Sequence, residues 1–229
     1  MKYLKIYENF QSEEEITRIC QRYGIRNFTI NNGLVDVDGN VNLDIQILSL
    51  GGLPVLTKLP VKFGHVSGYF YCHGNQLTSL EGAPQSVGRD FNCGSNQLTS
   101  LEGGPQLVGG DFRCHNNKLT SLEGGPKSVV GNFYSRGNQL RSLEGGPQFV
   151  GGGFHCDGNP VFQVWKLIHP GCLQSARYTG DDKWDEIHMD IFNDYDCIRG
   201  EDIVIDRFNE FLRHIGKPEV DSVKGYNNI

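Results

Sequence analysis

A single pattern, repeated with a constant step of 21 residues, fills the middle of this chain. Four segments that begin at Gly74, Ser95, Asn116 and Gly137 agree almost letter for letter. A fixed period of this length is typical of a solenoid, in which each repeat forms one coil and contacts only its neighbours. The positions that keep the step are Phe70, Phe91, Phe112, Phe133 and Phe154; Asn75, Asn96, Asn117, Asn138 and Asn159; Leu77, Leu98, Leu119 and Leu140; and Leu80, Leu101, Leu122 and Leu143.

The composition agrees with a repeat protein and favours a reducing compartment. The 30 glycines follow the repeat phase, so they indicate turns and not disorder. The seven cysteines are an odd number, and the opening MKYLKIYENF has too short an apolar run for a signal peptide. No window approaches the roughly 18 apolar residues of a membrane span. We therefore expect a cytoplasmic protein without a membrane segment.

The net charge of −6 is concentrated near the C-terminus. Residues 1–68 and 69–169 each balance seven basic against seven acidic side chains, whereas residues 170–229 carry seven basic and thirteen acidic ones. Binding to nucleic acid requires clustered Lys and Arg side chains that neutralise phosphates. The charge distribution therefore argues against nucleic acid as a partner.

Residues 1–50 predict an N-terminal cap made of a helix and a small antiparallel β-hairpin sheet. Ser12 and Glu15 form a capping-box signature, and Gly24 is suited to end the helix that they begin. Apolar residues then alternate with polar ones over residues 28–47, across the turn signal at residues 31–33. Such a cap would cover the open strand edge of the first coil.

Within residues 51–159, each coil is expected to form one short strand of a parallel sheet. Side chains alternate along a strand, so the Phe and Cys of each F-x-C segment would point inward and stack on those of the next coil, about 4.8 Å away. The Asn would be buried at the following turn as part of a structural ladder that binds backbone groups. The Gly-Gly-Pro segments would form the turns of an outer side without strands. Leu56 and Leu59 place a degenerate repeat at the start.

Residues 160–229 predict an acidic, helical C-terminal cap. Apolar stripes indicate helices near residues 161–168, 182–195 and 202–215. The tail over residues 219–229 shows no clear element.

A column of acidic residues has two possible arrangements. Like charges directly opposite one another are destabilising in a stack. The side chains would therefore fan into solvent or accept N–H groups of the turns, and the sequence does not decide between these. The residues are Glu81, Glu102, Glu123 and Glu144.

A column of cysteines is interpreted as buried free thiols. Stacked strands would place neighbouring Cα atoms within the range of a disulfide, whereas zinc requires a tetrahedral cluster that a straight column does not provide. Ser135 interrupts the series, and a free Cys behaves as a small apolar residue. The residues are Cys72, Cys93, Cys114 and Cys156.

The phase Phe91-x-Cys93-x-x-Asn96-x-Leu98 matches the leucine-rich repeat signature L-x-L-x-x-N-x-L. The tandem N-x-L-T-S-L-x-G-x-P units over residues 56–159 resemble more specifically the short-repeat proteins encoded by large tailed bacteriophages, as do the opening MKYLKIYENF and the closing GKPEVDSVKGYNNI. Two departures are the Cys at the second inward position and one extra residue between Val87 and Phe91. The resemblance implies an α+β leucine-rich repeat solenoid of 21-residue coils, which serves recognition and has no catalytic residues.

The positions between the inward Phe and Cys would point outward from the concave face of the sheet, and here the repeats differ. Variable positions are free for the choice of a partner, and Tyr and Arg are enriched in binding hot spots. The alternative is that solvent-facing positions simply drift. The predicted partner-binding residues are Tyr71, Asn92, Arg113, Tyr134 and His155 in one column and His73, His115, Arg136 and Asp157 in the next, beside the more acidic column Tyr69, Asp90, Asp111, Asn132 and Gly153.

Other constellations do not indicate an active site. His73, His115 and His155, with Asp157, would be spread over an open surface without a pocket to shift a pKa. The acids of residues 181–186 crowd an expected helix start, where they favour the helix dipole. The chain has no nucleotide-binding loop and no G-x-S-x-G motif. We expect no catalytic residue, no cofactor and no metal.

The predicted function is that of a non-enzymatic scaffold that binds a protein of the host cell and thereby blocks a host or defence function. Two alternatives stay open, namely a nucleotide or small-ligand sponge that uses the Tyr, Arg and His surface, and a component of the virion or its assembly. The acidic C-terminal cap is a possible second binding site. The sequence indicates neither the partner nor the oligomeric state.

Overall fold

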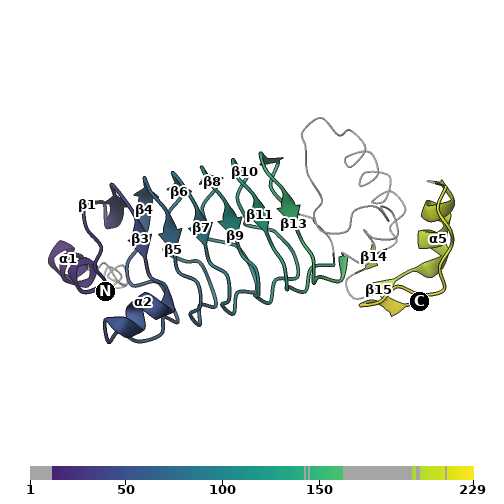
Figure 1. Ribbon diagram of the computed structural model, residues 1–229, viewed down its shortest axis with the longest axis horizontal. Coiled ribbons are helices and arrows are strands. Elements are labelled where there is room, and N and C mark those ends of the chain that lie inside the picture. The colour runs from purple at the N-terminus through teal and green to yellow at the C-terminus, as the bar shows by residue number, and fades with distance from the viewer. Residues whose placement is uncertain (1–11, 142, 144, 162–197, 200–201, 215) are drawn as a thin grey trace, which may run out of the picture.

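The chain forms a parallel β-solenoid whose coils stack side by side along the long axis of the molecule (Figure 1). A computed structural model describes residues 12–141, 143, 145–161, 198–199, 202–214 and 216–229. The elements are α1 (Glu13–Arg22), β1 (Phe28–Asn31), β2 (Leu34–Val37), β3 (Val41–Asn42), α2 (Ile45–Leu50), β4 (Phe63–Val66), β5 (Phe70–Tyr71), β6 (Ser86–Val87), β7 (Phe91–Asn92), β8 (Leu107–Val108), β9 (Phe112–Arg113), β10 (Ser128–Val129), β11 (Phe133–Tyr134), β12 (Phe149–Val150), β13 (Phe154–His155), β14 (Ile198–Arg199), β15 (Asp202–Ile203), α5 (Ile205–His214) and β16 (Asn227–Asn228).

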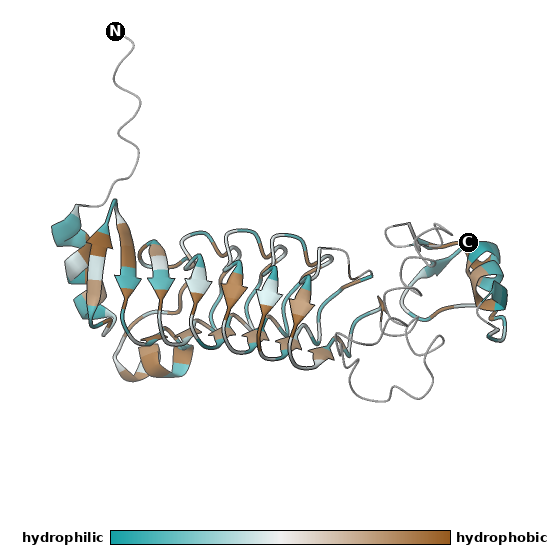
Figure 2. Cartoon of the chain, turned by 90° about the horizontal axis from the view of Figure 1, so that it is seen from above, coloured by the Kyte–Doolittle hydropathy of each residue, from teal (hydrophilic) through white to brown (hydrophobic). Residues whose placement is uncertain are grey.

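Each coil contributes one strand to each of two sheets. Sheet A has the order β1-β2-β4-β6-β8-β10-β12, and sheet B has the order β13-β11-β9-β7-β5-β3. Figure 2 shows the two rows of strands along the stack. The expectation of an outer side without strands was therefore wrong, because the short Ser-Val, Leu-Val and Phe-Val segments pair in parallel as sheet A.

The pairing keeps every coil in the same register. In sheet B, Phe91 pairs with Phe112, and Phe112 pairs with Phe133, so that equivalent residues lie directly beside one another. The five rings from Phe70 to Phe154 stack with centroids 4.9–5.5 Å apart and planes 10–13° apart. Burial of one such ring stabilises the fold by about 1.5–3 kcal/mol. The predicted phenylalanine column is thus the centre of the core.

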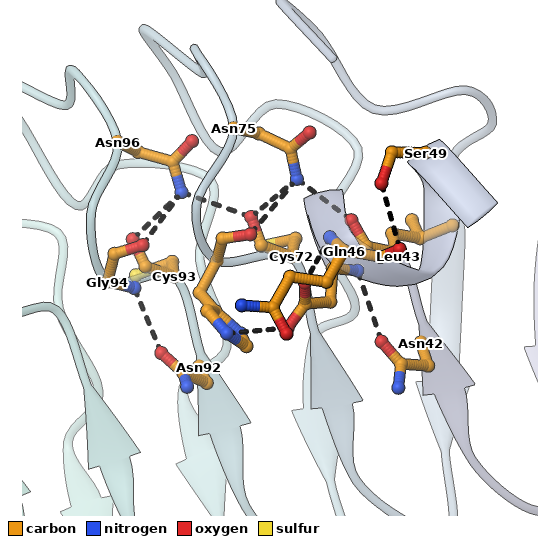
Figure 3. Close-up of polar contacts among 12 residues, drawn as sticks. Asn42, Leu43, Gln46, Ser49, Cys72, Asn75, Asn92, Cys93, Gly94 and Asn96 are labelled. Carbon is orange, nitrogen blue, oxygen red and sulfur yellow. Dashed lines mark hydrogen bonds and ion pairs between the residues drawn. The ribbon is translucent and has the colours of Figure 1, made fainter. Parts of the chain in front are cut away.

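The asparagines form a second column, which links each coil to the preceding one. The Oδ1 atom of Asn96 accepts the N–H of Leu77 at 2.9 Å, and its Nδ2 atom donates to the carbonyls of Cys72 and Cys93 at 3.1 and 3.0 Å. Figure 3 shows this amide and that of Asn75 side by side at the turns after the strands. The same arrangement recurs at Asn75, Asn117, Asn138 and Asn159.

The cysteines lie inside the solenoid as free thiols. Cys72, Cys93 and Cys114 are fully buried, and Cys156 is 4 % exposed. Burial raises the pKa of the first three thiols well above the ordinary value. Since the thiolate is the reactive form of cysteine, these protonated thiols are unreactive and serve to fill the core.

The turns explain the repeated glycines and settle the arrangement of the glutamates. Gly103 has φ +83°, a left-handed conformation that residues with a Cβ adopt at a cost. The next residue, Gly104, would bring a Cβ to 3.0 Å from the Leu80 side chain.

The glutamates that precede these turns point into solvent, which is the first of the two arrangements considered above. Glu81, Glu102 and Glu123 are all exposed, and Glu144 lies outside the described residues.

The N-terminal elements extend sheet A and its core. Ser12 accepts the N–H of Glu15, α1 ends before Gly24, and β1 and β2 form the expected antiparallel hairpin. The helix contributes Ile16 and Cys20 to the solenoid core. One expectation was wrong here, because the alternating pattern does not continue as a strand beyond Asn42, and β3 pairs in parallel with β5 and does not join the antiparallel hairpin. Asp44 accepts the N–H of Gln46, and this cap begins α2.

The two parallel ladders begin earlier than the sequence suggests. β2 pairs with β4 and β3 pairs with β5, so the first turn of the solenoid starts before residue 51. This first turn steps 29 residues, from Val41 to Phe70, because it contains α2.

The described C-terminal residues form a small sheet and a helix beyond the last coil (Figure 1). Helix α5 buries Phe208, Phe211 and Leu212, as its apolar stripe predicts. The tail was expected to have no element, but Asn227–Asn228 pairs with β15 as β16. The Tyr226 hydroxyl donates to the Arg141 carbonyl at 2.6 Å, which ties the tail to the solenoid. The two helices expected within residues 161–195 lie outside the described residues, apart from residue 161.

No helix in the described part of the chain is long and apolar enough to cross a membrane.

Replacing Phe112 by alanine tests the core column. The ring is fully buried between two neighbouring rings, so we expect a loss of about 3–5 kcal/mol in the free energy of unfolding. Chemical denaturation measures this loss. The matched control is Phe149→Ala, whose ring is 51 % exposed on sheet A and whose removal should cost much less. Equal losses for the two variants would contradict the packing described above.

Candidate functional site

The outward side chains of sheet B form the surface that the sequence singled out, which we call the sheet B face. In β5, β7, β9, β11 and β13 the first residue is buried and the second is half-buried, so Tyr71, Asn92, Arg113, Tyr134 and His155 stand on the outside. The next outward column is also in place, with His73, His115 and Asp157 half-buried and Arg136 exposed. The structure therefore gathers the predicted residues on one surface.

Arg113 is held by two carboxylates of the neighbouring column. Its Nη1 atom lies 3.0 Å from Oδ2 of Asp90, and its Nη2 atom lies 2.5 Å from Oδ2 of Asp111. Tyr71 donates its hydroxyl to the same Asp90 oxygen at 3.4 Å. Partial burial by itself would raise the pKa of Asp90, but the N–H of Asp111 and the guanidinium of Arg113 outweigh it and hold the pKa below its ordinary value. The positive charge of Arg113 is thus compensated by two carboxylates within the sheet B face.

The acidic column is a third ladder, which the sequence reading missed. Oδ1 of Asp90 accepts the N–H of Asp111 at 2.9 Å, and Oδ1 of Asp111 accepts the N–H of Asn132 at 2.7 Å. Asn132 repeats this contact to Gly153 at 2.8 Å. The recurrence of Asp or Asn at a 21-residue step is the signal that would have indicated it. These side chains support the face in addition to charging it.

Two aromatic stacks stand at opposite ends of the face. At the N-terminal end, Tyr69 and Tyr71 stack with ring centroids 4.3 Å apart. At the C-terminal end, Tyr134 stacks on His155 with centroids 4.6 Å apart and planes 7° apart.

Two guanidinium groups lie near the tyrosine ring of the C-terminal stack. The Cζ atoms of Arg113 and Arg136 lie 5.4 and 5.8 Å from the Tyr134 centroid, within the range of a cation–π contact. Arg136 is oriented by Asp157, whose Oδ1 atom lies 2.7 Å from Nε. Three of the predicted residues, Arg113, Tyr134 and Arg136, are therefore brought together as one cluster.

The remaining predicted residues make other contacts. Asn92 turns its amide back to accept the N–H of Gly94 at 3.0 Å. His73 pairs with Asp44, a residue that the sequence reading did not include, and Nε2 lies 2.5 Å from Oδ2. Burial lowers the pKa of His115, and the nearby His73, Arg113 and Arg136 lower it further. This imidazole is therefore neutral at pH 7.

The outer side of sheet A is a second surface, which the sequence reading did not anticipate. It exposes three large apolar side chains, Leu107, Val130 and Phe149, by 51–59 %. At its N-terminal end, His65 and Ser86 form a hydrogen bond of 2.7 Å. The surface lacks the charged clusters of the sheet B face, so we use it below as a control surface.

Among the described residues, no group of three or more His, Cys, Asp or Glu side chains is placed to hold a metal ion. The carboxylates of Asp90 and Asp111 bind arginine and backbone N–H groups and are not paired with each other as an acid and a base.

Comparison of the chain with protein-family models, with curated proteins and with solved structures finds no match. The function is therefore inferred from the surfaces themselves.

The Asp90–Arg113 contact predicts a pH dependence of stability. A carboxylate with a lowered pKa contributes stability that is present above the unfolded pKa, near 3.9, and is lost as the pH falls through the folded pKa. Asp90→Asn removes the charge and keeps an oxygen that accepts the Asp111 N–H. We expect this variant to be about 1 kcal/mol less stable at pH 7 and to lose less stability than wild type between pH 5 and pH 3.

Denaturation midpoints at pH 7, 5 and 3 measure this difference. Glu102→Gln is the control, since that side chain is exposed and its neutralisation should leave the acid sensitivity unchanged. The same loss of stability in Asp90→Asn and wild type on acidification would refute the role given to Asp90.

Proposed function

We propose that this chain is a non-enzymatic scaffold of the leucine-rich repeat class that binds a partner protein through the sheet B face. The observation that carries the proposal is the cluster around Tyr134, where the guanidinium groups of Arg113 and Arg136 lie within cation–π range of a tyrosine that stacks on His155. These side chains come from coils that are otherwise nearly identical, so the face is where the repeats differ.

The physical properties of this cluster suit protein recognition. Tyr and Arg supply most hot spots, and a side chain that is already ordered loses little entropy when it binds. The salt bridge of Arg136 to Asp157 and the stack of Tyr134 on His155 hold these groups in place before a partner arrives. Tyr134 and His155 also keep part of their surface open to solvent. The face therefore offers a rigid aromatic anchor with polar surroundings.

The charges of the face favour a protein over a nucleic acid. Four carboxylates lie on or beside it, and its two arginines are both paired with them. Phosphate binding needs unpaired cations in a row. A partner with mixed charges and an apolar or aromatic contact residue would fit better.

The repeat units resemble those of leucine-rich repeat proteins encoded by bacteriophages, and this resemblance suggests a biological context for the proposal. In that context the partner is a protein of the bacterial host, which the chain binds in the host cytoplasm, and binding would block a host or defence function.

The experiment compares two double variants in a pull-down from a lysate of the host. Tyr134→Ala with Arg136→Ala removes the anchor of the sheet B face, and truncation of a hot spot costs about 2 kcal/mol or more, or roughly 30-fold in affinity. Arg113 is left unchanged, because its removal would leave Asp90 and Asp111 adjacent without a counter-charge. Leu107→Ala with Phe149→Ala is the control on sheet A.

We expect wild type and the sheet A variant to retain the same partner and the sheet B variant to lose it, while all three unfold at similar denaturant concentrations. Loss of the partner only in the sheet A variant, or equal capture by all three, would show that the sheet B face is not the binding surface.

A further inference from the structure

Two histidines flank a glycine on the sheet B face. His73, Gly94 and His115 occupy the same phase of three successive coils, and the glycine leaves the middle position without a side chain. The other outward residues of this column, Arg136 and Asp157, are paired with each other. The gap at Gly94 is therefore a local feature of these three coils.

His73 is held by a buried carboxylate. Its Nε2 atom lies 2.5 Å from Oδ2 of Asp44, which is 8 % exposed. Asp44 is fixed in turn, because its Oδ1 atom accepts the N–H of Gln46 at the start of α2. A carboxylate at Nε2 places the imidazole hydrogen on that atom and leaves the lone pair on Nδ1. Within the described part of the chain, this Nδ1 atom is buried and has no hydrogen-bond partner.

His115 leans across the gap toward His73. A Cβ at position 94 would lie 2.4 Å from Cε1, 2.7 Å from Nε2 and 2.8 Å from Nδ1 of His115, so the imidazole covers the glycine. Two coils separate the backbones of the two histidines by roughly 10 Å, and the lean of His115 shortens the remaining gap to roughly one coil spacing, about 5 Å. Zinc binds imidazole nitrogen at about 2.0–2.1 Å, so two such bonds span at most about 4 Å, and a small further movement of the flexible His115 side chain would bring both imidazoles into range of one ion.

We propose that His73 and His115 bind a divalent transition-metal ion, with zinc as the test case, over Gly94. Asp44 then serves as the outer carboxylate that orients His73, an arrangement common among metal-binding histidines. Neutral imidazoles are suited to Zn²⁺, Cu²⁺ and Ni²⁺ and not to Mg²⁺. No third ligand of the described chain joins them, so water or a group of another molecule completes the coordination. This proposal does not depend on the function proposed above.

Gly94→Ala is the most specific test, because it leaves both ligands in place. The added methyl group would displace the His115 ring, which is the free end of a flexible side chain, while the backbone of Gly94 does not require glycine. Calorimetric titration of wild type with Zn²⁺ at pH 7 should show one ion per chain, and Mg²⁺ should show none. We expect Gly94→Ala, His73→Gln and His115→Gln each to weaken zinc binding by at least 10-fold.

Two further variants separate this site from the rest of the face. Asp44→Asn keeps an oxygen for the helix cap and should weaken zinc binding by about 10-fold, as outer carboxylates do. His155→Gln changes a histidine that stacks on Tyr134 instead, and its affinity should equal that of wild type. Nitrogen-15 NMR of the histidine side chains should show zinc-dependent shifts at Nδ1 of His73, and amide spectra confirm that each variant is folded.

The proposal is overturned if wild type binds no zinc at millimolar concentrations, if Gly94→Ala binds zinc as wild type does, or if His155→Gln abolishes binding.

Discussion

The buried amide of one asparagine per coil is the interaction on which this solenoid depends. At the end of each sheet B strand the chain turns, and its backbone groups leave the ladder within a core from which water is excluded. Asn96 accepts one N–H of the preceding coil and donates to a carbonyl in each of two coils. Buried backbone groups without partners are costly. The amide, which both donates and accepts, makes a turn at this point compatible with burial.

A repeat of fixed length follows from this contact. Each amide reaches the leucine N–H of the preceding coil only if equivalent residues stay in register, and the stacked phenylalanines require the same register. An insertion is tolerated where it leaves the solenoid, as α2 does in the 29-residue first turn. Packing in the interior thus fixes the residue types that are the same in every repeat, and the residues that vary between repeats lie on the sheet B face.

Some residues of the sheet B face also help to hold the coils together. Asp90, Asp111 and Asn132 each use one oxygen to bind the next coil, and Arg113 uses both carboxylates beside it. Structure and recognition therefore share residues in this column. Tyr134 and Arg136 contact the guanidinium, carboxylate and imidazole groups of the face, which makes them the better candidates for partner binding.

Periodicity predicted the core because most inward positions are occupied by the same residue type in each coil, with Ser135 as an exception in the cysteine column. The Phe and Asn columns, the α1 cap at Ser12 and the hairpin at β1 and β2 all follow from local patterns. Sheet A was missed because the outward column of its short strands, Ser86, Leu107, Ser128 and Phe149, has no common residue type.

Other features depend on contacts between distant segments, which a sequence pattern does not encode. The pairing of His73 with Asp44 joins residues 29 positions apart, through a turn whose length is not that of the repeat. The clamp of Arg113 by Asp90 and Asp111 depends on side-chain direction in addition to phase. β16 is a strand because residues 227–228 pair with β15, a contact between segments that are distant in the sequence.

Hydrogen exchange at the leucine amides tests the central role of the asparagine ladder most directly. The N–H groups of Leu98 and Leu140 are bound by Asn117 and Asn159, both at 3.0 Å. In Asn117→Ala, we expect the Leu98 amide to lose much more protection than the Leu140 amide, because only the first has lost its acceptor. Equal protection of the two amides in this variant would contradict the account, since the ladder would then not be what holds neighbouring coils together.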